Sequence, residues 1–391
     1  MTRPTATVGR FREEFTTAGD WLYFDHASTG YYPARTVAAI QEYAAQAADP
    51  IVYDTARNEQ LREETRAQVA RLTGAREEHV AFTSSLSEAM NLFVNGLDWS
   101  PSDNAVVPGG EFPSVTYAFV NVRKRYGIEL RRVPPDAEGR TNLDAIIAAL
   151  DGNTKAVALS HVEWADGYRN DVAALGEVCR ARGIELFVDA TQSMGAQPID
   201  VEAWGASAVA AHAYKWLLAG HGLGVVAFAE DAIERIYPAY AGFHSFETVL
   251  DDSSYSYDDT SSDFDFKPGA LRYQTGGFDK LSMTALNASL ALVLEADPAR
   301  SSAHGSELVG MLAEGAASRG YRVTSDLSDA HRAQFLALTT GSVAGDQQVV
   351  AALAGARVKT TLRPKGMRVS PYFYHDVNDV ERFLNALPGI D

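Results

Sequence analysis

The segment FVDATQSMGAQPIDVEAWGASAVAAHAYKWLLAGHGLG, residues 187–224, connects a buried strand to a lysine that lies among small and apolar residues. The strand, IELFVDA at 184–190, is apolar until it reaches the carboxylate of Asp189. Lys215 follows the next strand-like run, which begins at residue 206. Because ligands of open α/β sheets bind at the carboxyl ends of the strands, we expect Asp189 and Lys215 to meet in one site.

On both sides of this segment, short apolar runs alternate with amphipathic stretches. The strand-like runs lie at 79–85, 104–110, 128–134, 154–162 and 223–230, and the helical patterns lie at 87–97, 114–127 and 171–183. This alternation is typical of βα units and predicts a largely parallel sheet between helices. We therefore expect an α/β fold whose large domain holds that sheet.

A helical pattern at 278–298 indicates a domain boundary, because it is long enough to link a large domain to a smaller one. We predict an N-terminal arm at 1–25 that packs on the small domain, a large cofactor-binding domain at 26–277, and a linking helix with a small α+β domain at 278–391. The acidic, Ser- and Tyr-rich stretch 251–266 is expected to be a surface loop. Our hypothesis is that it borders the active site and contacts a polar or cationic substrate.

Composition excludes several classes of protein. The chain has 391 residues, 46% of them hydrophobic, which is enough to fill sizeable cores and argues against disorder. A net charge of −17 argues against nucleic acid and anionic lipid as partners. A single cysteine, Cys179, forms no internal disulfide and no multi-thiolate metal site, so we expect no metal. Without a secretory signal or an apolar run of about 20 residues, the protein is expected to be soluble and cytoplasmic.

The surroundings of Lys215 suggest a chemical role. Among neighbours such as Ala211 and Trp216, the charged form of its amine would be disfavoured, which makes a nucleophile able to form a Schiff base with an aldehyde. A carboxylate such as Asp189 at the pyridine nitrogen of pyridoxal phosphate would keep that nitrogen protonated.

The segment 187–224 resembles the core of class V aminotransferases, which are fold-type-I pyridoxal phosphate enzymes. The similarity covers about residues 23–383 and is closest to isopenicillin N epimerase-like and kynureninase-like members. It implies the fold-type-I architecture, with a mostly parallel, seven-stranded type of sheet, and pyridoxal 5'-phosphate as the cofactor. By this resemblance, Lys215 binds the cofactor, Asp189 pairs with its pyridine nitrogen and Gln192 faces its phenolic oxygen.

Other residues are predicted to hold the cofactor. FTSSLSEAMNL places Ser85, Leu86 and Ser87 at a helix start, where N–H groups and hydroxyls bind anions. The resemblance adds further contacts, which are His212 and Tyr214 near the phosphate, Phe112 stacked on the ring, and the loop of Thr275, Gly276 and Gly277, which in family dimers reaches the neighbouring subunit's phosphate. It also implies a homodimer.

The substrate is predicted to be a small molecule of the amino-acid type. Arg368 resembles the family arginine that binds the α-carboxylate, and a guanidinium suits this role because its fork pairs with both oxygens. The other candidate substrate contacts are His26, Ala27, Ser28 and Trp164. Each position also has an ordinary interpretation, since Asp189 and Ser84–Ser87 could cap helices and Arg368 could pair with Glu381 or Asp379.

The reaction is expected to be β-elimination from a substituted amino acid after Lys215 removes the Cα proton. Transamination, epimerisation and decarboxylating deamination stay open, and a non-catalytic protein that binds pyridoxal phosphate is a distant alternative. Cys179 lies in an amphipathic helical pattern rather than a loop, so a desulfurase that forms a persulfide on cysteine is not expected.

Overall fold

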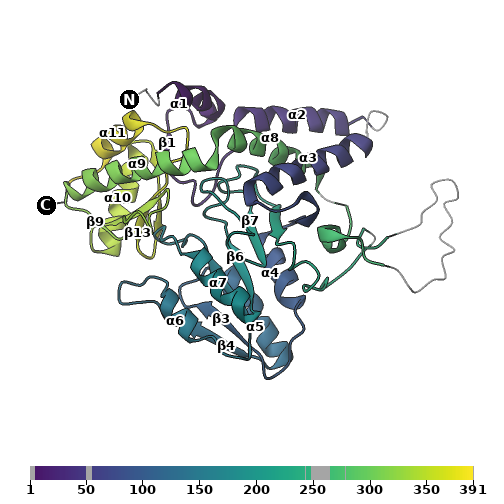
Figure 1. Ribbon diagram of the computed structural model, residues 1–391. Helices are drawn as coiled ribbons and strands as arrows, with labels where there is room; N and C mark the ends of the chain where they lie inside the picture. The colour runs from purple at the N-terminus through teal and green to yellow at the C-terminus, as the bar shows by residue number, and fades with distance from the viewer. Residues whose placement is uncertain (1–4, 50–54, 243, 248–264, 278, 391) are drawn as a thin grey trace.

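A seven-stranded sheet forms the centre of the computed structural model (Figure 1). The structure describes residues 5–49, 55–242, 244–247, 265–277 and 279–390. The order of the sheet is β2-β8-β7-β6-β5-β3-β4. The strands are β2 (Val80–Thr83), β3 (Asn104–Pro108), β4 (Glu129–Val133), β5 (Thr154–Ser160), β6 (Glu185–Asp189), β7 (Ala208–His212) and β8 (Gly224–Phe228). In this sheet β8 runs antiparallel to both its neighbours, β2 and β7. The strands β7, β6, β5, β3 and β4 run parallel to one another. The predicted, mostly parallel sheet is confirmed.

Helices α4 (Leu86–Asn95), α5 (Pro113–Tyr126), α6 (Leu143–Ala148) and α7 (Val172–Arg182) lie between these strands in the chain. The ends of α7 follow from its sequence. Asp171 caps the first turn by accepting a hydrogen bond from the Ala174 amide at 3.0 Å. Gly183 ends the helix in the left-handed conformation, with a φ of 66°. The chain then turns directly into β6, which delivers Asp189 to the edge of the sheet.

Three long helices, α2 (Ala34–Ala47), α3 (Thr55–Thr73) and α8 (Lys280–Ala296), lie side by side (Figure 1). Helix α8 corresponds to the predicted linking helix, except that residue 278 is outside the described residues. A further helix, α9 (Pro298–Ala317), follows at once and was not predicted. Asp297 separates the two with a φ of 64°, and its carboxylate caps α9 through the Ala299 amide at 2.9 Å.

The C-terminal residues form a second, antiparallel sheet in the order β12-β13-β10-β9. Its strands are β9 (Arg322–Val323), β10 (Leu336–Thr339), β12 (Thr361–Arg363) and β13 (Gly366–Val369), and helices α10 (Val343–Gly355) and α11 (Val377–Ala386) accompany them. A hydrophobic core of its own includes Leu312, Leu338 and Phe383. The predicted division into domains stays a prediction, although this separate core supports it.

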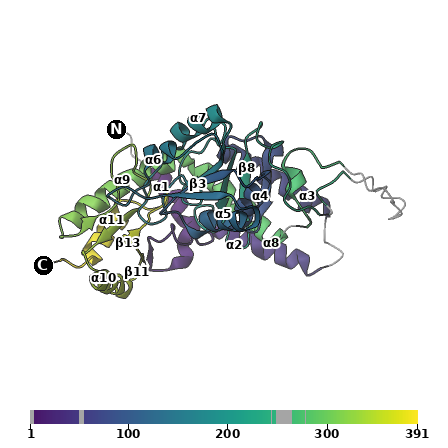
Figure 2. The same ribbon diagram turned by 90° about the horizontal axis from the view of Figure 1, so that it is seen from below.

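The N-terminal segment lies against this C-terminal part. Helix α1 (Thr5–Arg12) and the 3-10 turn η1 (Glu13–Ala18) precede β1 (Leu22–Tyr23), which pairs in parallel with β11 (Val358–Lys359). Leu22 and Phe24 are buried in the C-terminal core. Figure 2 shows α1 beside the yellow C-terminal elements from a second direction.

The other 3-10 turns are η2 (Glu77–His79) and η3 (Gly269–Tyr273). Most of the predicted 251–266 loop, up to residue 264, lies outside the described residues. No described helix has the length and apolar character that crossing a membrane requires.

Candidate active site

Lys215 lies in a tight turn after β7, at the edge of the sheet that also holds the end of β6. The N-terminal turn packs directly on it, since the Gly30 amide donates to the Tyr214 carbonyl at 2.8 Å. A Cβ on Gly30 would stand 2.1 Å from the carbonyl oxygen of Lys215, so a larger residue has no room there. The first residues of the chain therefore help to shape the lysine turn.

An open cleft of about 610 Å³ lies above this turn, between the central sheet and the β12–β13 hairpin. Eight predicted site residues line it, namely Ala27, Ser28, Phe112, Trp164, Gln192, Tyr214, Lys215 and Arg368. A narrower cavity continues inward and adds Leu86, Asp189 and His212. The structure thus brings together predicted residues from seven separate parts of the chain.

The amine of Lys215 is almost enclosed, with the residue 9% exposed. Its Nζ lies 5.8 Å from the centre of the Phe112 ring and 5.7 Å from that of Tyr214. Burial, followed by the charge of Arg368, lowers the pKa of Lys215 to about 7, although Asp189 opposes the shift. A large fraction of these amines is therefore uncharged near neutral pH and available as a nucleophile.

Asp189 is buried at the end of β6 and accepts a hydrogen bond from the Thr191 amide at 2.8 Å. Burial raises its pKa, while the Thr191 hydrogen bonds and the charge of Lys215 lower it. A cationic partner in the adjoining cavity would therefore stabilise its ionised form.

Gln192 is held in one orientation by two hydrogen bonds. Its Nε2 donates to the Ala27 carbonyl at 2.9 Å, and its Oε1 accepts from the indole of Trp216 at 2.9 Å. One of the two N–H groups of the amide is still available for a ligand oxygen. The fixed amide can therefore donate a hydrogen bond to a ligand oxygen there.

The start of α4 has the groups that an anion requires. Ser85 is its N-cap and accepts from the Glu88 amide at 3.2 Å, while the Ser87 hydroxyl donates to Ser114 at 2.9 Å. The Leu86 amide donates to Nδ1 of His212 at 3.4 Å, and burial, followed by Lys215, lowers the pKa of His212 to about 4. Neutral donors and hydroxyls at a helix N-terminus are groups that bind anions, so Ser85–Ser87 stay the predicted phosphate contacts beside His212.

Arg368 projects from β13 and is 1% exposed. One terminal nitrogen donates to the Trp164 carbonyl at 2.5 Å and the other to the Ser28 hydroxyl at 2.6 Å, while Nε has no partner among the described residues. Burial, followed by Arg363, lowers its pKa to about 9. The ordinary interpretation as a surface ion pair is wrong, because Asp379 pairs with Arg12 instead.

Some predicted residues lie elsewhere. His26 is fully buried behind the cleft, where its Nε2 meets the Tyr374 hydroxyl at 2.8 Å and burial lowers its pKa to about 3. Ser85 and Ser87 flank the inner cavity without lining it, and the loop of Thr275, Gly276 and Gly277 lines neither part of the site.

Other residues at the site were not predicted. Glu111 is buried and accepts from both the amide and the hydroxyl of Ser160 at 2.6 Å, which ties the start of α5 to the end of β5. Thr191 accepts from the His212 amide at 3.2 Å, and its position two residues after Asp189 could have indicated this. Arg363 lines the cleft beside Arg368, and the turn residues between the two arginines in LRPKGMR could have revealed a hairpin.

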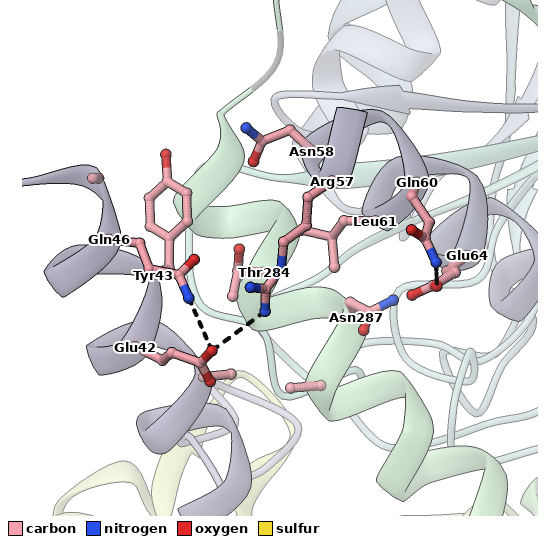
Figure 3. A pocket seen from close by; sticks show the side chains of 13 residues that line it. Glu42, Tyr43, Gln46, Arg57, Asn58, Gln60, Leu61, Glu64, Thr284 and Asn287 are labelled. Carbon is pink, nitrogen blue, oxygen red and sulfur yellow. Dashed lines mark hydrogen bonds and ion pairs between the residues drawn. The ribbon is translucent and has the colours of Figure 1, made fainter. Parts of the chain in front are cut away.

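A second groove, of about 540 Å³, lies between α2, α3 and α8 (Figure 3). Its polar side chains pair with one another. Glu42 accepts from Gln46 at 2.9 Å and from Arg57 at 3.3 Å, and Gln60 donates to Glu64 at 2.8 Å. None of the predicted site residues lines this groove. The chemistry therefore belongs to the cleft at Lys215.

Solved structures share this fold. The apo structure of a cysteine desulfurase from Thermococcus onnurineus aligns with a TM-score of 0.84 and 22% identity, over 98% of this chain and 97% of that one. The cystine C–S lyase C-DES, in complex with its product cysteine persulfide, aligns with a TM-score of 0.84 and 20% identity, over 96% of this chain and 100% of that one. The predicted fold of fold-type-I pyridoxal phosphate transferases is confirmed.

The family follows from the sequence comparison. The family model for aminotransferase class-V matches residues 22–383, and the chain belongs to this family. A probable cysteine desulfurase of Methanothermobacter thermautotrophicus is 31% identical over 68% of this chain, and an uncharacterized aminotransferase of Bacillus subtilis, YcbU, is 24% identical over 89% of each protein. The match spans 66% of the archaeal protein and 53% of an uncharacterized fission yeast relative that is 31% identical.

The protein is thus a pyridoxal phosphate-dependent enzyme of the class V aminotransferase family, as predicted. The residues present fit this cofactor. Lys215 has an enclosed amine with no hydrogen bond or ion pair to the described residues, Asp189 is a buried acid in the same cavity, and the start of α4 offers an anion site. Together they provide one group each for an aldehyde, a ring nitrogen and a phosphate.

Proposed function

We propose that the enzyme catalyses β-elimination from a substituted α-amino acid, as a C–S lyase or a related lyase. One observation carries this proposal: the uncharged amine of Lys215 and the buried guanidinium of Arg368 face the same cleft. The first can remove a proton and the second can hold a carboxylate. Relatives that include a probable cysteine desulfurase and the cystine C–S lyase fold support cleavage at Cβ.

The proposed mechanism assigns one task to each residue. Bound at Lys215, pyridoxal phosphate supplies an aldehyde that condenses with amines and a ring that accepts electrons from Cα. Arg368 binds the α-carboxylate and fixes the orientation of the Cα–H bond. The Nζ of Lys215 removes the Cα proton and can donate it to the departing group on Cβ. Asp189 would hold a proton on the ring nitrogen, and Phe112 and Trp164, whose rings meet edge to face at 5.7 Å, line the cleft.

A persulfide on the enzyme has no part in this proposal. Cys179, the one cysteine of the sequence, is fully buried in α7, and burial raises its pKa to about 12. A thiol in that state is a poor nucleophile. Together with Phe112 and Tyr214, this supports our placement of the protein with epimerase-like and kynureninase-like members rather than with cysteine desulfurases.

The test is to incubate the enzyme with β-chloroalanine and with cysteine S-conjugates and to measure pyruvate and ammonia. We expect equal amounts of both from the wild type and none from Lys215→Ala, with Lys124→Ala, an exposed lysine on α5, as the control. Stoichiometric oxo acid with the pyridoxamine form of the cofactor would instead show transamination. Loss of chirality at Cα without pyruvate would show epimerisation, release of carbon dioxide would show decarboxylation, and no reaction would indicate a binding protein.

We further propose that the enzyme is a homodimer, in which the loop at 275–277 reaches the cofactor phosphate of the partner. The proposal is supported by the absence of this loop from the lining of the cleft and of the inner cavity within one chain. Sedimentation equilibrium should give twice the mass of the 42.3 kDa chain. A monomer that retains full activity would contradict it.

A further inference from the structure

Two arginines, rather than one, face the substrate cleft. Arg363 ends β12 and Arg368 lies on β13, and both line the cavity above Lys215. The strands pair so that Thr361 is opposite Arg368. Because residues two apart on a strand share a face, Arg363 lies on the same face of the hairpin as Arg368. The resemblance that identified Arg368 assigned nothing to Arg363.

The two guanidinium groups converge on one neutral oxygen. Arg363 donates to the Ser28 hydroxyl at 3.0 Å and Arg368 donates to the same hydroxyl at 2.6 Å. Their terminal nitrogens therefore lie within a few ångströms of each other. Placing two cations this close is unfavourable, and the charge of Arg363 indeed lowers the pKa of Arg368.

The described residues do not neutralise this pair. Neither arginine forms an ion pair with a described carboxylate, and Nε of Arg368 is buried without a partner. Asp25 is close enough for its charge to raise the pKa of Arg368, but its carboxylate pairs with Lys359 at 3.8 Å and accepts from Thr361 at 2.5 Å. Asp346 lines the cleft and is bound by Thr339 at 2.8 Å and by the Thr340 amide at 2.6 Å.

The cleft thus combines three basic side chains, those of Lys215, Arg363 and Arg368, within a protein whose net charge is −17. One carboxylate of an amino acid satisfies one guanidinium fork. We propose that the substrate carries a second anionic group on its side chain, a few bonds from the α-carboxylate, and that Arg363 binds it. This inference rests on the proposed function only in that Arg368 binds the α-carboxylate.

Binding of carboxylates without turnover tests this directly. Succinate and butanoate have the same four-carbon chain but carry two carboxylates and one, so calorimetric titration of the holoenzyme separates the second charge from size. We expect succinate to bind at least about tenfold more tightly, as one charge-assisted bidentate pair would provide. Arg363→Gln should remove this preference while changing butanoate affinity less than about twofold, and Arg300→Gln, an exposed arginine on α9, should change neither.

Two results would overturn the inference. Equal affinity of the wild type for the two acids would mean that no second anion site exists. If Arg363→Gln weakened the binding of succinate and of butanoate equally, the two arginines would hold one carboxylate together. Aspartate and asparagine, which have the same shape, provide a second readout through the absorbance change of the cofactor, and aspartate should show the lower dissociation constant in the wild type alone.

The second anion site and β-elimination can each fail without the other. A preference for dianions without release of pyruvate would retain the second anion site and contradict β-elimination. Release of pyruvate from uncharged and acidic substrates with equal KM would support β-elimination and contradict the second anion site.

Discussion

Burial at single residues sets the chemistry of this site. The amine of Lys215 is enclosed by Phe112 and Tyr214, and its pKa falls to about 7 without any fixed partner. Asp189 shows the opposite shift for the same reason, because removing water disfavours any charged form. A bound cofactor would relieve both groups, since it supplies a carbon for the amine and a cationic nitrogen for the acid. The enclosed amine thus lowers the stability of the empty protein.

Replacing this amine by a thioether should stabilise the cofactor-free protein. The pKa of Lys215 is about 7 in the folded state and 10.5 in the unfolded chain, so the penalty is complete below pH 7 and disappears as the pH approaches 10.5. We expect Lys215→Met to raise the free energy of unfolding at pH 7 by about 1–3 kcal/mol, and by less at pH 9.5. Urea denaturation at both values measures this. If the gain in stability of Lys215→Met grew with pH, the lowered pKa of Lys215 would be contradicted. Lys124→Met, at an exposed lysine, is the control.

Asp189→Asn should retain the fold and lose catalysis. The amide has the shape of the carboxylate but no charge with which to hold a proton on the ring nitrogen. We expect kcat to fall about 100-fold or more, as for other electrostatic contacts to a reacting group. Cofactor binding, followed by its absorbance, should persist. An unchanged kcat would mean that Asp189 is only a structural end of β6.

At the scale of elements, the hairpin β12–β13 carries both arginines, and its turn depends on one glycine. Gly366 has a φ of 127°, and a Cβ there would stand 2.3 Å from the Leu338 carbonyl oxygen. The sequence alternates apolar and polar residues from Met367 to Ser370, a pattern typical of a strand that includes Arg368. It did not predict the short strand of Arg363, since TLR is only three residues long and owes its position to pairing with β13.

Gly366→Ala should therefore weaken the hairpin. The combined clash and backbone strain should lower the free energy of unfolding by about 2–3 kcal/mol and also reduce carboxylate binding. Gly341→Ala is the matched control, because its φ is 93° and no atom lies within 4 Å of its Cβ. It should cost about 1 kcal/mol, as backbone strain alone does. If Gly366→Ala and Gly341→Ala lost the same free energy of unfolding in thermal or urea denaturation, the contact with Leu338 would have no effect.

At the scale of the whole molecule, the cleft exists because the C-terminal part is attached to the central sheet. Local patterns predicted the strands of the central sheet and helices α4, α5, α7 and α8, with ends close to those observed, but not helices α2, α3, α6 or α9. They did not predict contacts between distant segments, such as Ser28 with Arg368 or Gln192 with Ala27, because no periodicity encodes them. One such contact is the ion pair of Lys365 with the buried Asp166, at 2.6 Å, which joins the hairpin turn to the large sheet.

Breaking the ion pair of Lys365 with Asp166 should weaken the attachment of the C-terminal part to the central sheet. Lys365→Met leaves the carboxylate of Asp166, which is 1% exposed, without its cation, and should cost about 3 kcal/mol of stability. It should also weaken binding of carboxylates, because Arg363 and Arg368 would lose their fixed position. Arg357→Gln removes an exposed pair with Asp20 and should cost almost nothing. Chemical denaturation and calorimetry measure the two effects, and the same small loss in both variants would argue against a structural role for Lys365.

We expect Lys215 to bind pyridoxal phosphate in the cleft that it shares with Asp189 and Arg368. Reduction of the purified holoenzyme with borohydride, followed by proteolysis and mass spectrometry, tests it most directly, because reduction makes the bond between the cofactor and its lysine permanent. A pyridoxyl phosphate group is expected on the peptide that contains Lys215, and on no other lysine. A label on another lysine, or none in a protein loaded with the cofactor, would contradict it.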